Sequence, residues 1–468
     1  MLDIDILQYV KNYGTFEVKI KSFDEFYLPS DDVISYYTIS GPQIEISQNK
    51  YIRIRQNILG VKQLGIYVDD EYLAAVEYDD SEDWELDLSE FEISEGRHRI
   101  NLKGMDEGLN DNYSNTVYFY GGIVPIYGVS GLTGSTVTLT RTDDSELLTF
   151  NINTETGEIS SDFDNVFPWK DTEIVEDEAG KFILFPTMYF RVGTNSSNNI
   201  TDIAVSPAPH EEGNWYEVPP FMYGCYAASV VDGKMKSLSG AVPTTALTRA
   251  NFRSYAQKTG ELYHQLDLYH YIVLNFLFWI EFATKNTRNI MTGKYTGSGT
   301  LKGTTKLKTG GTDHLINPSG YNLETTQMRY HYIEDFVGNV YQFIDGIYCT
   351  STSSSNYATA DPKKFSDTST GMNQLSFKNP SSSYSYPTTT TIGWDPNNPF
   401  LVMPTGAVNN SSYNTYFCSR NANLGSYVLY YGGAYSTSLV NTGTFALTRC
   451  STTQTYDNVG ARLIKRIE

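Results

Sequence analysis

The sequence predicts a mainly β protein with a few helices (α+β). Short runs alternate apolar and polar residues with period two, as in Tyr51-Ile-Arg-Ile-Arg55, which is typical of half-buried strands. The 37 tyrosines occur with many Gly, Ser, Thr and Asn residues, a composition that suits strands joined by long ordered loops. Residues 267–284 form the longest apolar run, and their spacing is helical. A chain of 468 residues is expected to fold into two to four domains.

The first 120 residues predict an attachment segment followed by a β-sandwich. Residues 1–35 mix short apolar runs with acidic and aromatic residues, and they suit either a docking segment or the first strands of the next domain. Residues 64–68 and 72–76 are separated by the acidic turn 69–71, which is hairpin spacing. Regular short strands without a helical pattern predict an immunoglobulin-like β-sandwich over residues 36–120.

Residues 267–284 predict a buried core helix. Asp267 is a good N-cap residue, and apolar residues nearly encircle the helix, so burial on most sides is expected. A membrane span is the alternative. The run is shorter than the roughly 20 apolar residues that a bilayer requires, and it contains Asn275 and Glu281. The core helix is therefore favoured, and the rest of residues 121–468 should pack around it.

A second helix and two long loops are predicted around this core helix. The helix should span about residues 249–258, with Thr248 as its cap and Gly260 at its end. The segments 290–325 and 350–390 are rich in Gly, Thr, Ser and Asn and poor in large apolar residues. They are interpreted as surface loops because apolar segments resume after each one.

Charge and cysteine content exclude several classes of protein. The formal charge is −20 and the basic residues form no long run, so nucleic-acid binding is not expected. The four cysteines are widely spaced and form no Cys-x-x-Cys pair, which excludes a disulfide scaffold and a zinc site of that type. No secretory signal is visible, so folding in the cytoplasm of the producing cell is expected.

Two resemblances to known families follow from motifs. The segment Gly96-Arg-His-Arg-Ile-Asn-Leu-Lys-Gly-Met-Asp106 resembles the end of bacterial immunoglobulin-like domains, which implies a spacer or adhesive module. Residues 121–468 resemble the C-type-lectin-like fold of the formylglycine-generating-enzyme (sulfatase-modifying-factor) type, especially the version in bacteriophage virion proteins and retroelement-diversified proteins. The motifs that carry this second resemblance are Phe163-Asp-Asn-Val-Phe-Pro-Trp169, Ile280-Glu-Phe-Ala-Thr-Lys-Asn286, Gly338-Asn-Val-Tyr-Gln-Phe343, Gly432-Gly-Ala-Tyr435 and Val459-Gly-Ala-Arg-Leu-Ile464.

Several residues of these motifs also have a structural interpretation of their own. Gly338 and Asn339 form a turn dipeptide before an apolar strand. Gly432 and Gly433 allow a positive φ or a close backbone approach. Arg462 lies among apolar neighbours and should be buried, with Glu281 as a candidate partner.

The enzyme members of the resembled family imply chemistry that this sequence does not support. The copper-dependent oxidases use two cysteines in the closing segment, where this chain has Cys450 but Gly443-Thr-Phe445 at the partner position. The histidines show neither a His-x-x-x-His pair nor a facial triad. Calcium is considered at Asp106, Asn110, Asp111 and Asn112, but their spacing favours a solvated turn. No catalytic residue, metal site or cofactor is predicted, and the protein is not expected to be an enzyme.

A recognition surface is the remaining hypothesis. Tyrosine among Ser, Gly and Asn provides a large contact area at low entropic cost. In the resembled fold, residues 409–435 face the ligand, and Trp394 is a further candidate for stacking on a sugar. The candidate tyrosines are Tyr413, Tyr416, Tyr430 and Tyr435. The alternative for all of them is packing between strands or in the core.

The resulting hypothesis is a bacteriophage structural protein that displays a lectin-like domain to a host-surface glycan or protein. It would be a head or tail fibre, or a capsid decoration subunit, located in the virion. The N-terminal region would bind other virion proteins, and a homotrimer is favoured by analogy with phage fibres. Neither nucleic-acid binding nor membrane insertion is expected. The alternatives are a retroelement-diversified adhesin, a non-binding decoration protein and, less favoured, a copper-dependent oxidase.

Overall fold

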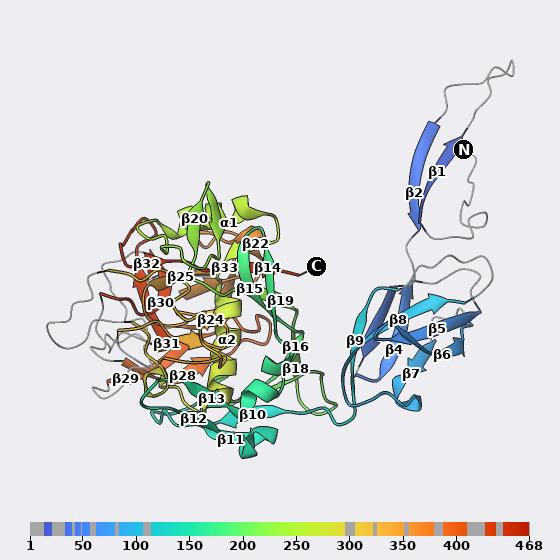
Figure 1. Cartoon of the computed structure of the whole chain (residues 1–468), viewed down its shortest axis with the longest axis horizontal. Helices are drawn as coiled ribbons and strands as arrows, with labels where there is room; N and C mark the ends of the chain where they lie inside the picture. Colours follow the sequence, from blue (N-terminus) through green and yellow to red (C-terminus); the bar gives the residue numbers. More distant parts are fainter. Residues whose placement is uncertain are drawn as a thin grey trace. The chain divides into compact units, whose positions relative to one another are not determined.

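The structure is a computed structural model. It describes residues 14–20, 33–39, 43–47, 49–56, 62–79, 84–105, 114–294, 305–321, 325–350, 355–378, 387–409, 426–436 and 443–467. The chain divides into two compact units, one of Met1–Val124 with Ala208–Glu212 and one of Pro125–Pro207 with Gly213–Glu468. The described residues are mainly β, with two α-helices, α1 (Arg249–Thr259) and α2 (Leu268–Phe282) (Figure 1). Neither helix has the length and apolarity that a membrane crossing requires.

The smaller unit contains a hairpin and two facing sheets. The hairpin pairs β1 (Gly14–Ile20) with β2 (Val33–Ile39). One sheet has the order β3 (Gln43–Ser47), β4 (Tyr51–Gln56), β7 (Glu85–Asp87). The other has the order β6 (Glu71–Glu77), β5 (Gln63–Val68), β8 (Gly96–Gly104), β9 (Val117–Gly121). Ile52 of the first sheet and Ile66 of the second are fully buried in one core cluster, so the period-two pattern does build a sandwich.

The larger unit is built from antiparallel sheets around the helices. The first five-stranded sheet has the order β11 (Thr140–Asp143), β10 (Tyr127–Ser130), β17 (Ile200–Ser206), β16 (Met188–Thr194), β18 (Trp215–Val218). The second has the order β14 (Glu173–Asp177), β15 (Gly180–Phe185), β19 (Phe221–Gly224), β33 (Leu463–Arg466), β22 (Tyr263–Gln265). The six-stranded sheet has the order β27 (Asn373–Lys378), β26 (Ser355–Ala358), β25 (Tyr341–Thr350), β30 (Ser426–Gly432), β31 (Gly443–Cys450). β32 (Val459–Gly460) pairs in parallel with β25.

Four hairpins complete the larger unit. They are β12 (Phe150–Ile152) with β13 (Ile159–Ser161), β20 (Ser229–Val231) with β21 (Lys234–Lys236), β23 (Arg329–Tyr330) with β24 (Ile333–Glu334), and β28 (Pro387–Gly393) with β29 (Met403–Asn409). The strands surround α2 on several sides, as the apolar composition of that helix requires (Figure 1).

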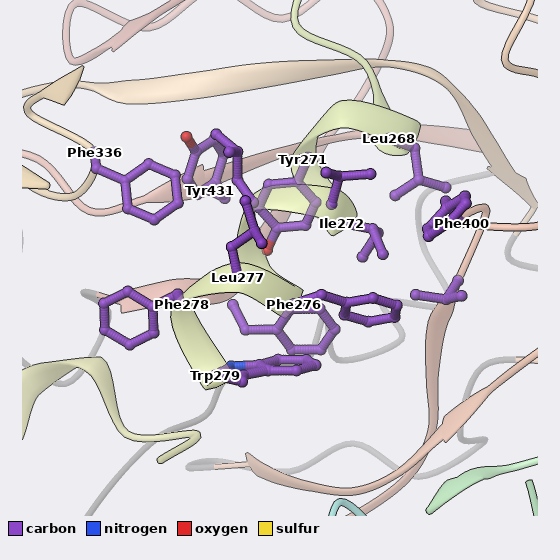
Figure 2. Close-up of a cluster of buried hydrophobic side chains, with 14 of the residues drawn as sticks. Leu268, Tyr271, Ile272, Phe276, Leu277, Phe278, Trp279, Phe336, Phe400 and Tyr431 are labelled. Atoms are coloured by element: carbon purple, nitrogen blue, oxygen red, sulfur yellow. The ribbon is translucent and has the colours of Figure 1, made fainter. Parts of the chain in front are cut away.

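Helix α2 is the centre of the main core, as predicted. Asp267 caps it by accepting a hydrogen bond from the backbone N–H of His270, and every residue of the helix except Tyr269 is buried. Phe278 and Phe336 pack on one side of the helix, while Phe400 packs on another (Figure 2). Packing on several faces explains why a helix of 15 residues is so apolar without crossing a membrane.

Helix α1 also begins and ends close to the predicted positions. Thr248 and Asn251 form a capping box, and Gly260 follows the last residue. Two arginines hold the helix against β25: Arg253 donates two hydrogen bonds to the buried Asp345, at 2.7 and 2.8 Å, and Arg249 donates to the backbone carbonyls of Ile344 and Ile347. Arg249 also pairs with Asp367, which lies outside β25, at 2.7 Å.

One prediction about a loop and one about an ion pair are wrong. The segment 350–390 contributes β26 and β27 to the six-stranded sheet and most of β28 to a hairpin, so it is not a surface loop. The described part of 290–325 contains neither a helix nor a strand, so the loop prediction is confirmed there, although Thr309 and Thr312 are buried. The segment 350–390 is rich in small polar side chains and lacks the apolar alternation that identifies a strand in a sequence.

Arg462 is fully buried, as predicted, but Glu281 is not its partner. Its guanidinium donates to Gln342 Oε1 at 2.8 Å and to the carbonyl oxygens of Gly224, Glu334 and Asp335. Glu281 instead contacts His331. A buried arginine requires acceptors in its own plane, and backbone carbonyls supply them here without a second buried charge.

The predicted turn glycines have the expected backbone. Gly338 and Asn339 have φ of 85° and 57° immediately before β25, and Gly432 and Gly433 have φ of 105° and 93° at the end of β30. These left-handed conformations cost little at glycine, which explains the residue type at each turn.

Candidate ligand-binding site

A polar pocket of about 390 Å³ lies in the larger unit, and we call it the β27–β28 pocket. Its walls come from four places: the turn between β16 and β17, strand β27, the hairpin β28–β29, and the residue that follows β28. The residues that line it are Ser197, Asn198, Asn199, Ser376, Phe377, Lys378, Thr391, Trp394 and Thr405. Its volume is within the roughly 300–1,000 Å³ that small-molecule sites occupy.

Local hydrogen bonds hold the turn 195–199 against the hairpin. The Thr405 hydroxyl donates to Asn199 Oδ1 at 2.7 Å and also lies 2.9 Å from the Thr391 hydroxyl. The backbone N–H of Trp394 donates to the carbonyl of Asn198 at 2.8 Å. Asn198 has a φ of 54°, a left-handed conformation that asparagine tolerates better than most residues.

Glycine allows the aromatic wall to approach the hairpin closely. A Cβ atom at Gly393 would lie 2.5 Å from the Phe377 ring, so no other residue fits there without displacing that ring. Phe377 is half-buried, and Trp394 is 3% exposed because its ring packs edge-to-face on Tyr216 and Phe400. The aromatic side of the pocket is therefore rigid.

The pocket offers hydroxyl and amide groups rather than a cluster of charges. Asn198 and Ser376 are exposed, and Lys378 is the charged residue of the lining. Hydroxyls and amides both donate and accept hydrogen bonds, so they complement a ligand that carries many hydroxyl groups. Among the described residues, the lining contains no acidic side chain.

The predicted contact residues have different outcomes. Tyr430 and Tyr435 are each 8% exposed, and Tyr430 packs edge-to-face on Tyr341 and Phe343. Their burial argues against direct ligand contact and agrees with the packing alternative. Trp394 is buried in the core but borders the β27–β28 pocket. Tyr413 and Tyr416 lie outside the described residues.

A buried carboxylate with two histidines lies at the start of α2. Asp267 accepts hydrogen bonds from His264 Nε2 at 2.8 Å and from His270 Nδ1 at 2.9 Å, in addition to the backbone N–H of His270. Burial opposes ionisation of Asp267, but the two imidazoles and their hydrogen bonds hold its pKa below the ordinary value. Each oxygen of Asp267 has a partner, so this cluster caps the helix and offers a metal ion no unpartnered carboxylate oxygen.

The copper site of the resembled oxidases does not fit the residues present. Cys450 is buried, and burial raises the pKa of its thiol to about 12, so it is protonated at neutral pH. Phe445, near the position of the second thiol, is a buried core residue. The turn considered for calcium, from Asp106 to Asn112, lies outside the described residues.

Sequence reasoning did not find the β27–β28 pocket. Its residues come from segments around positions 198, 377 and 391–405, and Asn199 and Thr405 are 206 residues apart. The sequence signals near the pocket are the Asn-rich turn 195–199 and the threonine run 388–391. Both patterns are typical of loops and strands in general, so neither indicates a binding site. Only the pairing of these segments in space makes them one site.

Comparison with known proteins gives a distant structural similarity. No protein-family model matches the chain, and no curated protein matches it. Among solved structures, it is similar to PvdO from Pseudomonas aeruginosa, with 11% identity and a TM-score of 0.27 over 63% of this chain and 98% of that chain. The site described above depends on its own geometry and not on this likeness.

Proposed function

We propose that this chain is a bacteriophage virion protein whose lectin-like larger unit binds a host-surface glycan in the β27–β28 pocket. The observation that supports the proposal is the composition of that pocket. Its lining combines exposed amide and hydroxyl groups with two aromatic residues, Phe377 and Trp394, and the volume of about 390 Å³ suits one or two sugar rings. The immunoglobulin-like sandwich of the smaller unit would serve as a spacer, and the N-terminal segment would bind other virion proteins.

The chemistry of a glycan matches the lining in two ways. Sugar hydroxyls form hydrogen bonds in pairs of donor and acceptor, which the side chains of Asn198 and Ser376 can both supply. Lys378 would attract an acidic sugar or a phosphate substituent. The pocket has few partners to offer a purely apolar ligand, because its exposed lining is polar.

The experiment is a binding measurement with the full chain on a panel of bacterial surface polysaccharides and on whole bacterial cells. The variant Asn198→Gly keeps the left-handed backbone and removes the amide. Loss of one such hydrogen-bonding group should weaken glycan binding by about 1 kcal/mol, roughly fivefold. Lys378→Ala should weaken binding of acidic glycans more than that of neutral ones.

Matched controls separate the pocket from general effects. Asp232→Gly replaces another exposed turn residue with a positive φ, of 52°, and Lys170→Ala removes an exposed charge elsewhere. Both should bind like the unchanged chain. Full binding by Asn198→Gly and Lys378→Ala would place the contact elsewhere, with the segment 409–435 as the next candidate. Failure of the unchanged chain to bind any surface would favour a non-binding decoration role.

The remaining parts of the hypothesis have separate tests. A homotrimer, in analogy with phage fibres, would be measured by sedimentation equilibrium of the full chain. A retroelement-diversified adhesin would require a nearby template repeat of the closing codons together with a reverse transcriptase gene. Labelling of intact particles would distinguish a head position from a tail position.

A further inference from the structure

Three titratable side chains from separate segments meet near the C-terminal end of α2. Asp164 lies in a short 3-10 turn (Asp162–Asn165), Glu281 in the last turn of α2, and His331 in the tight turn between β23 and β24. His331 Nε2 lies 2.8 Å from Glu281 Oε2, and His331 Nδ1 lies 3.3 Å from Asp164 Oδ1. One ligand atom from each residue can be chosen so that all three lie within 4.8 Å of one another. The spacing suits a shared ion.

Two carboxylate oxygens in this cluster are buried without a hydrogen-bond partner. Glu281 is fully buried, and its Oε1 has no partner that meets hydrogen-bond geometry, although the Tyr330 hydroxyl interacts with this carboxyl group. Asp164 Oδ1 also has no hydrogen-bond partner, although it lies near His331. The neighbouring Arg141 does not satisfy Glu281 Oε1, because its guanidinium donates to the backbone carbonyls of Ile280 and Glu281. A buried carboxylate oxygen without a partner carries a large desolvation cost.

Charge in the cluster is unfavourable without a cation. Two carboxylates that share a buried position repel each other unless a positive group lies between them. The cluster of His264, Asp267 and His270 provides the contrast, since each oxygen of Asp267 has a partner there.

We propose that Asp164, Glu281 and His331 bind a divalent transition-metal ion, with zinc as the expected ion. Two oxygen ligands and one imidazole are a donor set that zinc accepts, and its affinity exceeds that of manganese or iron at most such sites. The indole of Trp169 stacks on the imidazole of His331, with centroids 3.6 Å apart and planes 10° apart, and this fixes the orientation of the ring.

The bound ion would join three parts of the larger unit that are distant in sequence. Glu281 and His331 are 50 residues apart, and Asp164 belongs to a segment that precedes both helices. A cation would replace the repulsion between the carboxylates with coordination bonds, so metal binding would add to the free energy of unfolding. The Asp164 side chain is 18% exposed, which leaves a route for the ion to enter. The inference is independent of the glycan proposal.

The test is metal binding by the full chain, purified without an affinity tag and treated with a chelator. Titration with zinc should show one tightly bound equivalent, and cobalt should give the visible absorption of a site with oxygen and nitrogen ligands. Zinc should also raise the melting temperature. Asp164→Asn and His331→Gln should each lower zinc affinity by more than the roughly 10–100-fold that loss of a ligand-supporting group costs.

Controls keep the test independent of folding defects. Asp162→Asn changes an exposed carboxylate two residues away, and His314→Gln changes an exposed histidine. Both should bind zinc like the unchanged chain. Circular dichroism of each variant would show that the fold is retained. The proposal is overturned if the unchanged chain binds no stoichiometric zinc or cobalt, since His331 would then simply bridge the two carboxylates. Unchanged affinity in folded Asp164→Asn and His331→Gln would overturn it equally.

Discussion

At the residue scale, the interior of the larger unit contains several ionised or strongly polar side chains, each with a particular partner. Arg462 has four acceptors, three of them backbone carbonyls. Lys285 is 2% exposed and donates to the carbonyls of Leu132 and Gly134, and burial lowers its pKa to about 8. Such groups stabilise the fold only while their partners remain in place.

The pair of Asp267 and His264 should make stability depend on pH. Burial lowers the pKa of His264, although Asp267 opposes this effect, and the two imidazoles hold the pKa of Asp267 low. The unfolded chain therefore takes up these protons at a higher pH than the folded chain. The two groups contribute their full stabilisation above the pKa values that they have in the unfolded chain. This contribution is lost as the pH falls below about 6.5 for His264 and then below about 3.9 for Asp267.

The measurement is the free energy of unfolding in urea at several pH values between 7.5 and 5. His264→Gln can still donate a hydrogen bond to Asp267 but cannot take up a proton. This variant should lose less stability across the range, by about 1.4 kcal/mol for each pKa unit by which His264 is depressed. The groups that face His264 are Asp267, His270 and Arg466. The exposed His314→Gln should follow the unchanged chain. Parallel curves for all three proteins would contradict the prediction.

At the element scale, α2 is determined partly by its local sequence and partly by the structure around it. The cap at Asp267 and the nearly continuous apolar character were readable from the sequence. The predicted run extends to Thr284, whereas the helix ends at Phe282, with Ala283 in the left-handed conformation at φ 47° and ψ 40°. That conformation costs a non-glycine residue roughly 1–2 kcal/mol.

Ala283→Gly should therefore stabilise the protein. The gain is expected to be about 0.5–1 kcal/mol, since glycine removes the strain at this position but adds freedom to the unfolded chain. The measurement is the urea midpoint of the full chain.

The same substitution in α1 is the matched control for this prediction. Ala256 lies in the interior of that helix and is buried, and Ala256→Gly should destabilise the protein by about 1 kcal/mol or more. Equal destabilisation by both variants would mean that Ala283 is not strained.

Strands β26 and β27 illustrate the limit of periodicity. The segment that contains them is dominated by Ser, Thr and Asn, and it was assigned to a loop for that reason. They form strands because β25 provides a long buried edge with which β26 pairs, and β27 then pairs with β26. A sheet edge can recruit a segment whose own strand preference is weak.

At the scale of the whole molecule, the two units have separate cores of different size. The core of the smaller unit is a small and mostly aliphatic cluster, while the larger unit has an extensive aromatic core around α2. Stability increases with the apolar area that a unit buries, so the smaller unit should be the less stable one.

Scanning calorimetry of the full chain should therefore show two transitions, with the smaller unit melting first. A fragment that begins at Pro125 removes most of the smaller unit and should keep the transition at higher temperature. Ile66→Ala, in the core of the smaller unit, should lower the first transition and leave the second unchanged. A single transition in the full chain, or loss of the upper one in the fragment, would show that the units do not fold separately.

The elements were more predictable than the sites. The cap at Thr248, the turn at Gly338 and Asn339 and the buried position of Arg462 all depend on residues close in sequence, and all agree with the structure. The partner of Arg462 and the burial of Tyr430 depend on which strands become neighbours. Periodicity contains no information about strand order, so these outcomes could not be read from it.

The amino-acid sequence alone determined that the protein is mainly β, where α1 and α2 start, and which apolar run forms the core, since these properties arise from interactions over a few residues. Only the tertiary structure decided which polar groups meet. Asn199 and Thr405 in the β27–β28 pocket, and Asp164, Glu281 and His331 at the end of α2, come from segments that no local pattern connects. Their meeting depends on the order in which strands pair and on the way the sheets enclose one helix. Hydrophobic burial drives that enclosure without regard to the polar residues that it brings together.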